Sequence, residues 1–197
     1  FGNLPPEAMA AMDAQRFERL PEEAFGGFKP EQMRVLPPEL MGGFNADRVK
    51  NLAPEAMAGM DAQRFGALPP EAMAGFKGDQ FGNLPPEAMA AMDAQRFEQL
   101  PEDAFGGFKP EQMRVLPPEL MGGFDANRVK NLAPEAMAGM AADRIKALPP
   151  EAIEGFKGDQ FANLPPEAMA GMDVERFGRL PEDAFGGFKP EQMRVLP

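Results

Sequence analysis

The chain lacks six residue types that carry much of protein chemistry. Its 197 residues contain no Cys, His, Trp or Tyr, and they contain no Ser or Thr either. The hydroxyl and thiol nucleophiles, the imidazole base and the thiolate and imidazole metal ligands are therefore missing. Disulfides, Asn-glycosylation sequons and hydroxyl phosphorylation are excluded for the same reason. We expect that the chain is not an enzyme, and we predict no catalytic, cofactor-binding or metal site.

Positive charge is also scarce. Lys and Arg number 20 against 31 Asp and Glu, so the formal net charge is −11, and no basic stripe interrupts the acidity. Nucleic-acid phosphates and anionic membrane surfaces repel such a chain, so nucleic acid is not an expected partner. These residues contain no apolar run long enough to span a bilayer, and we expect neither a signal peptide within them nor membrane insertion.

Proline and glycine are abundant, and they recur with a period. The 23 Pro and 21 Gly fall into 16-residue repeats that begin at Leu4, such as LPPEAMAAMDAQRFER and then LPEEAFGGFKPEQMRV. Twelve full repeats occupy residues 4–195, with partial repeats at both ends, and a second period of 80 residues spans five repeats. A repeat this short must stack on its neighbours to bury its apolar face. We therefore predict one repeat array over 1–197, and we expect it to be a segment of a longer array.

Each repeat carries the start signals of two short helices. In the first repeat, Pro5, Pro6 and Glu7 suit a first helical turn, because proline needs no hydrogen-bond partner there and a carboxylate faces the positive end of the dipole. A second helix follows, and its predicted N-caps are Asp13, Asn45 and Asp61 in three repeats. Pro30, Pro110 and Pro190 occupy its predicted first position in others. The next Leu-Pro ends it, since the residue before proline is pushed out of the α region.

The apolar spacing predicts which side chains are buried. In the first repeat these are Leu4, Ala8, Met9, Met12 and Phe17, and in the second they are Leu20, Ala24, Phe25, Phe28 and Met33. Proline twice in each repeat and the lack of period-two alternation exclude strands. The fold prediction is an all-α solenoid of stacked helical hairpins, advancing by about 8 to 10 Å per repeat. Within it, Phe97 is expected to be buried and Gln99 exposed.

Small residues at the seventh and eighth positions of each repeat, such as Gly26 with Gly27, allow two interpretations. Glycine can end the first helix in a left-handed cap, or it can let two backbones approach closely. We favour mainly the cap. Neither interpretation assigns a function.

Three chemistries can be weighed against structural roles. Met pairs such as Met9 with Met12 and Met57 with Met60 have the spacing of a Cu(I) thioether site. Phe25 with Phe28 replaces such a pair in another repeat, so core packing is the favoured interpretation. The full set of Met pairs is Met9 and Met12, Met57 and Met60, Met89 and Met92, Met137 and Met140, and Met169 and Met172.

An acidic residue stands fourth in every repeat and forms a ladder that could collect Ca²⁺. Its structural role is to complement the positive end of each helix, which explains an acid in all twelve repeats. The sequence also contains pairs of carboxylates such as those that catalyse glycoside hydrolysis. An active site occurs once in a chain, however, whereas these pairs recur in every repeat, so the repetition argues against catalysis. The ladder comprises Glu7, Glu23, Glu39, Glu55, Glu71, Glu87, Asp103, Glu119, Glu135, Glu151, Glu167 and Asp183.

The pattern L-P/A-P/E-E-A-M/F-x-G-F/M, followed by D/K-A/P-x-Q/R-F/M/V, covers the whole chain. It resembles the helix-turn-helix repeats of about 16 residues that occur in tandem in large bacterial secreted and surface proteins. The resemblance implies an extracellular or cell-surface stalk, fibre or adhesive role. Such proteins often carry calcium-binding repeats as well, but the Gly-Asp-rich nonapeptide of those repeats is absent here.

The leading functional hypothesis is a structural building block of a filament, stalk or spacer that associates with itself, end to end or laterally, without a cofactor. A protein-binding scaffold or adhesin segment is the alternative, and a designed repeat protein is a second one. The tenth position of each repeat favours self-assembly, because its variation is mostly copied with the 80-residue block. It reads Asp13, Lys29, Asn45, Asp61 and Lys77, then Asp93, Lys109, Asp125, Ala141 and Lys157.

Overall fold

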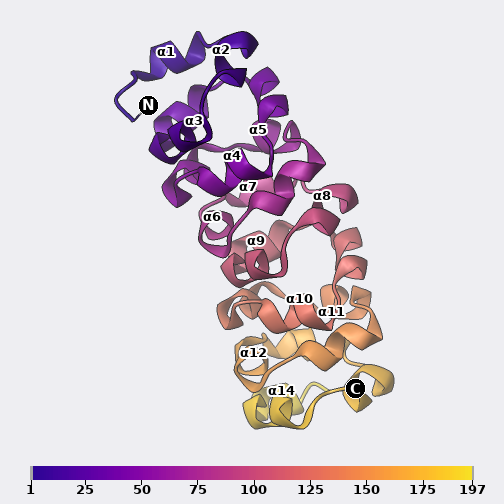
Figure 1. Ribbon diagram of the computed structural model, residues 1–197. Helices are drawn as coiled ribbons and strands as arrows, with labels where there is room; N and C mark the ends of the chain where they lie inside the picture. Colours follow the sequence, from indigo (N-terminus) through magenta and orange to yellow (C-terminus); the bar gives the residue numbers. More distant parts are fainter. Residues whose placement is uncertain (1, 197) are drawn as a thin grey trace. The chain divides into compact units, whose positions relative to one another are not determined.

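The structure is a computed structural model that describes residues 2–196, and all regular structure in that range is helical (Figure 1). The chain forms two compact bodies, residues 1–107 and residues 108–197, each of which is described here by itself. Within each body, short helices pack in regular succession, which confirms the predicted all-α repeat solenoid.

Each repeat holds two helices, and the two differ in type. The first is a six-residue 3₁₀-helix in ten repeats: η1(Glu22–Gly27), η2(Pro38–Gly43), η3(Pro54–Gly59), η4(Pro70–Gly75), η5(Glu102–Gly107), η6(Pro118–Gly123), η7(Pro134–Gly139), η8(Pro150–Gly155), η9(Pro166–Gly171) and η10(Glu182–Gly187). In the first and sixth repeats it is a short α-helix: α1(Pro6–Ala10) and α7(Pro86–Met89). The second helix is α-helical throughout: α2(Ala14–Glu18), α3(Pro30–Val35), α4(Ala46–Asn51), α5(Ala62–Gly66), α6(Gly78–Gly82), α8(Ala94–Gln99), α9(Pro110–Val115), α10(Ala126–Asn131), α11(Ala142–Ala147), α12(Gly158–Asn163), α13(Val174–Gly178) and α14(Pro190–Met193).

The predicted start and stop signals of these helices are confirmed. The side chains of Asp13, Asn45 and Asp61 each accept a hydrogen bond from the backbone N–H three residues on, at 2.8 to 2.9 Å. Pro30, Pro110 and Pro190 stand first in α3, α9 and α14. The helices are marginal alone at four to six residues, so their stability comes from packing.

The main packing contact inside each body joins repeats two apart. In the N-terminal body α3 packs on η3 and α4 on η4, and in the C-terminal body α9 packs on η7 and α10 on η8. Neighbouring repeats also touch, as α12 does with η7. Two repeats therefore share each turn of the solenoid, and the expected advance of one packing distance per repeat was wrong.

Glycine at the eighth position makes this contact possible. A Cβ added at Gly155 would lie 1.9 Å from the carbonyl oxygen of Ala126, the first residue of the helix two repeats earlier. The same approach, at 1.7 to 2.4 Å, recurs at Gly59, Gly75, Gly107, Gly139, Gly171 and Gly187. No glycine among the described residues has a positive φ. The left-handed cap that we favoured was therefore wrong, and the close approach of two backbones is the reason for glycine here.

The type of the first helix also correlates with the residue at the eighth position. Ala11 and Ala91 replace glycine there in the first and sixth repeats, and these are the two repeats whose first helix is α-helical. Their methyl group would collide with a carbonyl held as close as the glycines are. The change from a 3₁₀-helix to an α-helix therefore coincides with the change from Gly to Ala at this position.

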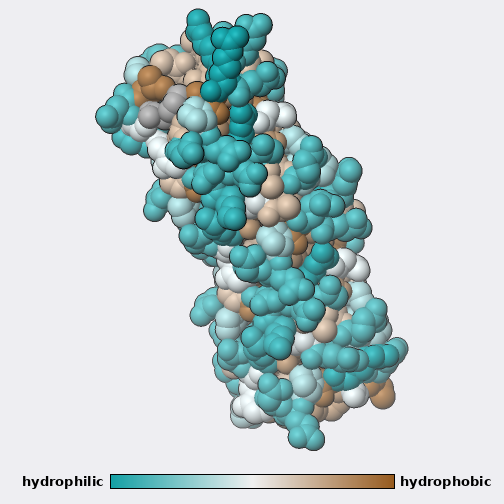
Figure 2. All heavy atoms as spheres, in the orientation of Figure 1, coloured by the Kyte–Doolittle hydropathy of each residue, from teal (hydrophilic) through white to brown (hydrophobic). Residues whose placement is uncertain are grey.

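The predicted apolar positions form the core inside each body. Met9, Phe17, Phe25, Phe28 and Met33 are buried, and Phe97 is buried while Gln99 is exposed, as predicted. Leu4 is 38% exposed and Ala8 is exposed, whereas their equivalents Leu52 and Ala56 are buried. The prediction was wrong at Leu4 and Ala8 because no earlier repeat among the described residues covers them. It was only partly right at Met12, Leu20 and Ala24, which are half-buried. Hydrophilic side chains cover most of the face seen in Figure 2.

Candidate functional site

The Met pairs lie in the core. Met57 and Met60 are both fully buried, and so are the second members Met92, Met140 and Met172, to within 3% exposure. Met12 is half-buried. These positions hold the methionines among the apolar side chains of the repeat, as core packing predicts.

The acidic ladder lies on the surface. All twelve of its members are exposed. Among residues 2–196, no three acidic side chains come together as a group that could hold a metal ion. The ladder stands in the first turn of the first helix in each repeat, where a carboxylate complements the helix dipole.

The polar chemistry of the array is concentrated at the thirteenth position of each repeat, which holds Gln or Arg. The five Gln side chains at this position, Gln32, Gln80, Gln112, Gln160 and Gln192, are at most 1% exposed. Gln160 shows their role. Its Oε1 accepts from the backbone N–H of Lys157 at 2.9 Å, and its Nε2 donates to the carbonyls of Val129 and Leu132 at 2.7 and 2.9 Å. One side chain thereby caps the start of its own helix and the end of the helix two repeats earlier.

Arginine performs the same task in five other repeats, at Arg48, Arg64, Arg96, Arg144 and Arg176. The guanidinium of Arg176 donates through Nη2 to the carbonyls of Lys146 and Leu148 at 2.6 and 2.9 Å. Its Nη1 pairs with the carboxylate of Asp173, whose other oxygen accepts from the Arg176 backbone N–H. The carboxylate therefore performs the N-terminal capping that Gln performs through its own Oε1.

The sequence-based prediction assigned no role to this position. The signal was available, since the thirteenth residue of all twelve repeats is Arg or Gln. The choice also follows the tenth residue: Lys accompanies Gln, while Asp, Asn or, in one case, Ala accompanies Arg. The tenth-position variation that we took for a surface feature is therefore half of a two-residue junction.

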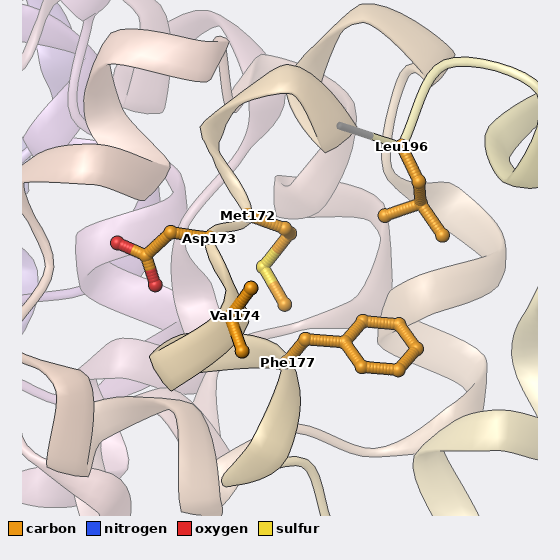
Figure 3. Close-up of a pocket in the computed structure, with 5 residues that line it drawn as sticks. All are labelled: Met172, Asp173, Val174, Phe177 and Leu196. Carbon is orange, nitrogen blue, oxygen red and sulfur yellow. The ribbon is translucent and has the colours of Figure 1, made fainter.

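Figure 3 shows an apolar pocket of about 200 Å³ in the C-terminal body. Met172, Val174, Phe177 and Leu196 line it, and Asp173 lies at its edge with its carboxylate pointing away from the apolar side chains. Val174 is 91% exposed. The Asp173 carboxylate is engaged by Arg176, and the other four lining side chains are apolar, so the pocket offers mainly an apolar contact surface.

The carboxyl of Asp173 has a lowered pKa. The hydrogen bond from the backbone N–H of Arg176 is the main cause that lowers its pKa below 3.8, and the charge of Arg176 adds to it. The shift belongs to the helix cap rather than to a reactive group.

No protein-family description matches the chain, and no curated protein matches it either. None of the described helices is both long and apolar enough to cross a lipid bilayer. Function must therefore be argued from the chain's own residues.

Proposed function

We propose that the chain is a non-enzymatic structural element, a building block of a filament, stalk or spacer outside a bacterial cell, that associates with copies of itself. The periodic junctions support this proposal. Within each body, two features recur between repeats two apart: the close approach at the eighth position, found in seven repeats, and the cap at the thirteenth. Adding repeats in this way adds length without adding a new kind of contact.

Four exposed apolar side chains support the self-association part of the proposal, and together they are called the α13–α14 surface: Val174 in α13, Phe185 in η10, Met193 in α14 and Val195 after it. Phe185, Met193 and Val195 are 46%, 52% and 42% exposed, beside the exposed Val174. Leu4, at the other end of the described residues, is 38% exposed. A second copy that covers one end with the other recovers apolar area at about 25 cal/mol per Å². A head-to-tail contact that does not close into a ring generates an open filament.

Sedimentation velocity over a range of protein and salt concentrations tests self-association. The net charge of −11 opposes contact between copies, and salt screens this repulsion, so larger species are expected to increase with ionic strength. Electron microscopy of the same samples distinguishes filaments from closed oligomers. A monomer under all conditions would contradict self-association and leave only the spacer role.

A matched pair of variants locates the contact. Val115 and Val195 end two repeats of identical sequence, and both are 42% exposed. V195D adds a charge beside the α13–α14 surface and is expected to weaken association, whereas V115D adds the same charge elsewhere and is expected to leave it unchanged. Equal effects of the two variants would exclude end-to-end docking.

A protein-binding scaffold is the second candidate, and the apolar pocket at Met172, Val174, Phe177 and Leu196 is the observation that favours it. Solenoids present long surfaces on which a partner can be held. The same sedimentation series distinguishes the two functions. A filament building block is expected to form larger species, whereas a scaffold that binds other proteins does not require association between its own copies.

A further inference from the structure

Methionine is the residue type of this chain that peroxides oxidise most readily. The sequence has 16 Met and no Cys, Trp, Tyr or His, the other residue types that common oxidants attack. Fourteen of the 16 are at most 3% exposed, and Met12 is half-buried. Met193 differs from all of them, because it is 52% exposed. Its thioether side chain is therefore open to an oxidant in the solvent while the chain stays folded.

The same heptapeptide surrounds Met193 and two buried methionines. KPEQMRV occurs at residues 29–35, 109–115 and 189–195. Met33 and Met113, in the first two of these segments, are fully buried. The local sequence and the chemistry of the thioether are the same in all three segments. The difference in exposure therefore comes from the cover that other repeats provide.

The first helix of a later repeat covers each buried methionine. The α3 helix packs on η3, and α9 packs on η7. A Cβ added at Gly139 of η7 would lie 2.8 Å from the Cβ of Met113, so the backbone of η7 lies directly against this side chain. No first helix two repeats after α14 is present among residues 2–196. Met193 thus lacks the cover that its two counterparts have.

We propose that Met193 is a site of selective oxidation by peroxides, and that its oxidation weakens the association of copies. The thioether sulfur attacks one oxygen of hydrogen peroxide and forms an S–O bond as the O–O bond breaks. The sulfur loses two electrons, and the departing hydroxide takes the proton of the transferred oxygen and leaves as water. The product is methionine sulfoxide, which is polar where the thioether was apolar.

The effect on association rests on the proposed function. Met193 belongs to the α13–α14 surface, together with the exposed Val174, Phe185 and Val195. A sulfoxide covered by an apolar contact has no hydrogen-bond donor for its oxygen, so the oxidised chain gains less from the contact. Association and oxidation oppose each other, because a copy that covers Met193 also shields its sulfur from peroxide.

Peptide mass spectrometry tests the modification site. The wild-type chain receives a limited dose of hydrogen peroxide at a protein concentration at which sedimentation velocity gives a monomer. Trypsin cleaves after Arg and spares the Lys-Pro bonds, so Met33, Met113 and Met193 fall into separate peptides, 20–34, 97–114 and 180–194. Met193 is expected to be oxidised at least about tenfold faster than the other two, because they react only when the chain opens locally. Equal rates at the three positions would overturn the proposal.

The variant M193L isolates the effect on association. Leucine keeps this position apolar and close in volume, but it has no sulfur to oxidise. Wild type and M193L are expected to associate equally before treatment. The same peroxide dose is expected to weaken the association of the wild type by about tenfold or more and to leave M193L unchanged. Treatment with methionine sulfoxide reductases is expected to restore the wild type. An equal loss in both proteins, or no loss in a wild type whose Met193 is oxidised, would overturn the effect on association.

The two measurements separate the oxidation site from the proposed function. If the untreated wild type stays monomeric under all conditions, self-association fails, and the effect of oxidation on it falls as well. Faster oxidation of Met193 would still assign the modification site in that case. If copies associate but Met193 of the monomer reacts no faster than Met33 and Met113, self-association stands and the oxidation site is overturned.

Discussion

Two repeats at opposite ends of the chain have nearly the same sequence and different burial. Residues 20–35 and residues 180–195 differ at one position, where Glu23 stands in the first and Asp183 in the second. Phe25 and Met33 are fully buried in the first, while their counterparts Phe185 and Met193 are 46% and 52% exposed. Burial is therefore a property of the neighbours of a repeat rather than of its own sequence.

Local features do not differ in this way. Gln32 accepts from the Lys29 N–H at 2.9 Å, and Gln192 accepts from the Lys189 N–H at 2.8 Å. Both second helices begin at proline, but α3 has six residues and α14 has four. Caps thus start the helix in either place, and packing from later repeats determines how far it continues.

The largest expected effect comes from removing the aromatic ring in both repeats. Phe25→Ala is expected to destabilise the chain by about 3 to 5 kcal/mol, because the ring is fully buried and leaves a cavity. Phe185→Ala is expected to cost less than about 2 kcal/mol, because about half of the ring already meets water. Urea unfolding of both variants measures the difference.

Protein concentration sharpens this prediction. If copies cover the α13–α14 surface, the cost of Phe185→Ala is expected to rise with concentration, while that of Phe25→Ala stays constant. Equal costs for the two variants at low concentration would contradict the burial difference.

A smaller effect on stability is expected when either of two adjacent glycines of η10, Gly186 or Gly187, is replaced by alanine. The η10 helix packs backward on α12, and a Cβ at Gly187 would lie 1.7 Å from the carbonyl oxygen of Gly158. Gly187→Ala is therefore expected to cost about 1 to 3 kcal/mol, although its repeat lies at an exposed end. A Cβ at Gly186 meets no atom within 4 Å, so Gly186→Ala is expected to be neutral or to stabilise by up to about 1 kcal/mol.

Thermal unfolding followed by circular dichroism compares these two variants. Similar melting temperatures for Gly186→Ala and Gly187→Ala would mean that the eighth position does not approach the earlier helix. The comparison of the repeats would then have to be explained without close packing between repeats two apart.

The sequence was sufficient for the features that lie within one repeat. The 16-residue period, the caps at Asp13 and Asn45 and the prolines at Pro30 and Pro110 predicted the helices and their order, because these signals act over one turn. The buried set was also predicted from spacing, and it failed at Leu4 and Ala8, where cover by other repeats decides the outcome.

Features that join repeats could not be read in the same way. Because all repeats have nearly the same sequence, the pattern does not show whether a helix packs on the next repeat or on the one after it. The packing of α3 on η3, two repeats later, therefore could not be predicted. Gly59 allows either a cap or a close approach, and only the position of Pro30 two repeats earlier decides between them. The junction at Gln160 went unnoticed because its partners lie 28 and 31 residues away.

The smallest expected effect on stability comes from the ionisation of Asp173, which caps α13 beside the apolar pocket. Its titration tests whether a helix cap forms even where few neighbouring repeats bury the helix. The hydrogen bond from the Arg176 backbone N–H holds the pKa of Asp173 below 3.8 in the folded chain. A lowered pKa in the folded state means that the carboxylate stabilises the fold above pH 3.8, and that this stabilisation is lost as the pH falls through the folded-state value. Because the Asp173 side chain is exposed to solvent, water screens the interaction and the change in stability is expected to be small. An NMR titration of the Asp173 carboxyl carbon is expected to give a midpoint below 3.8 in the wild type and a higher one in R176Q. The rise in R176Q is expected to be partial, since Gln removes the charge and the guanidinium bond but keeps the backbone N–H that is the main cause of the shift. A wild-type midpoint at or above 3.8 would show that the cap of α13 is not formed in solution, and that at this end of the array local structure also depends on cover from other repeats.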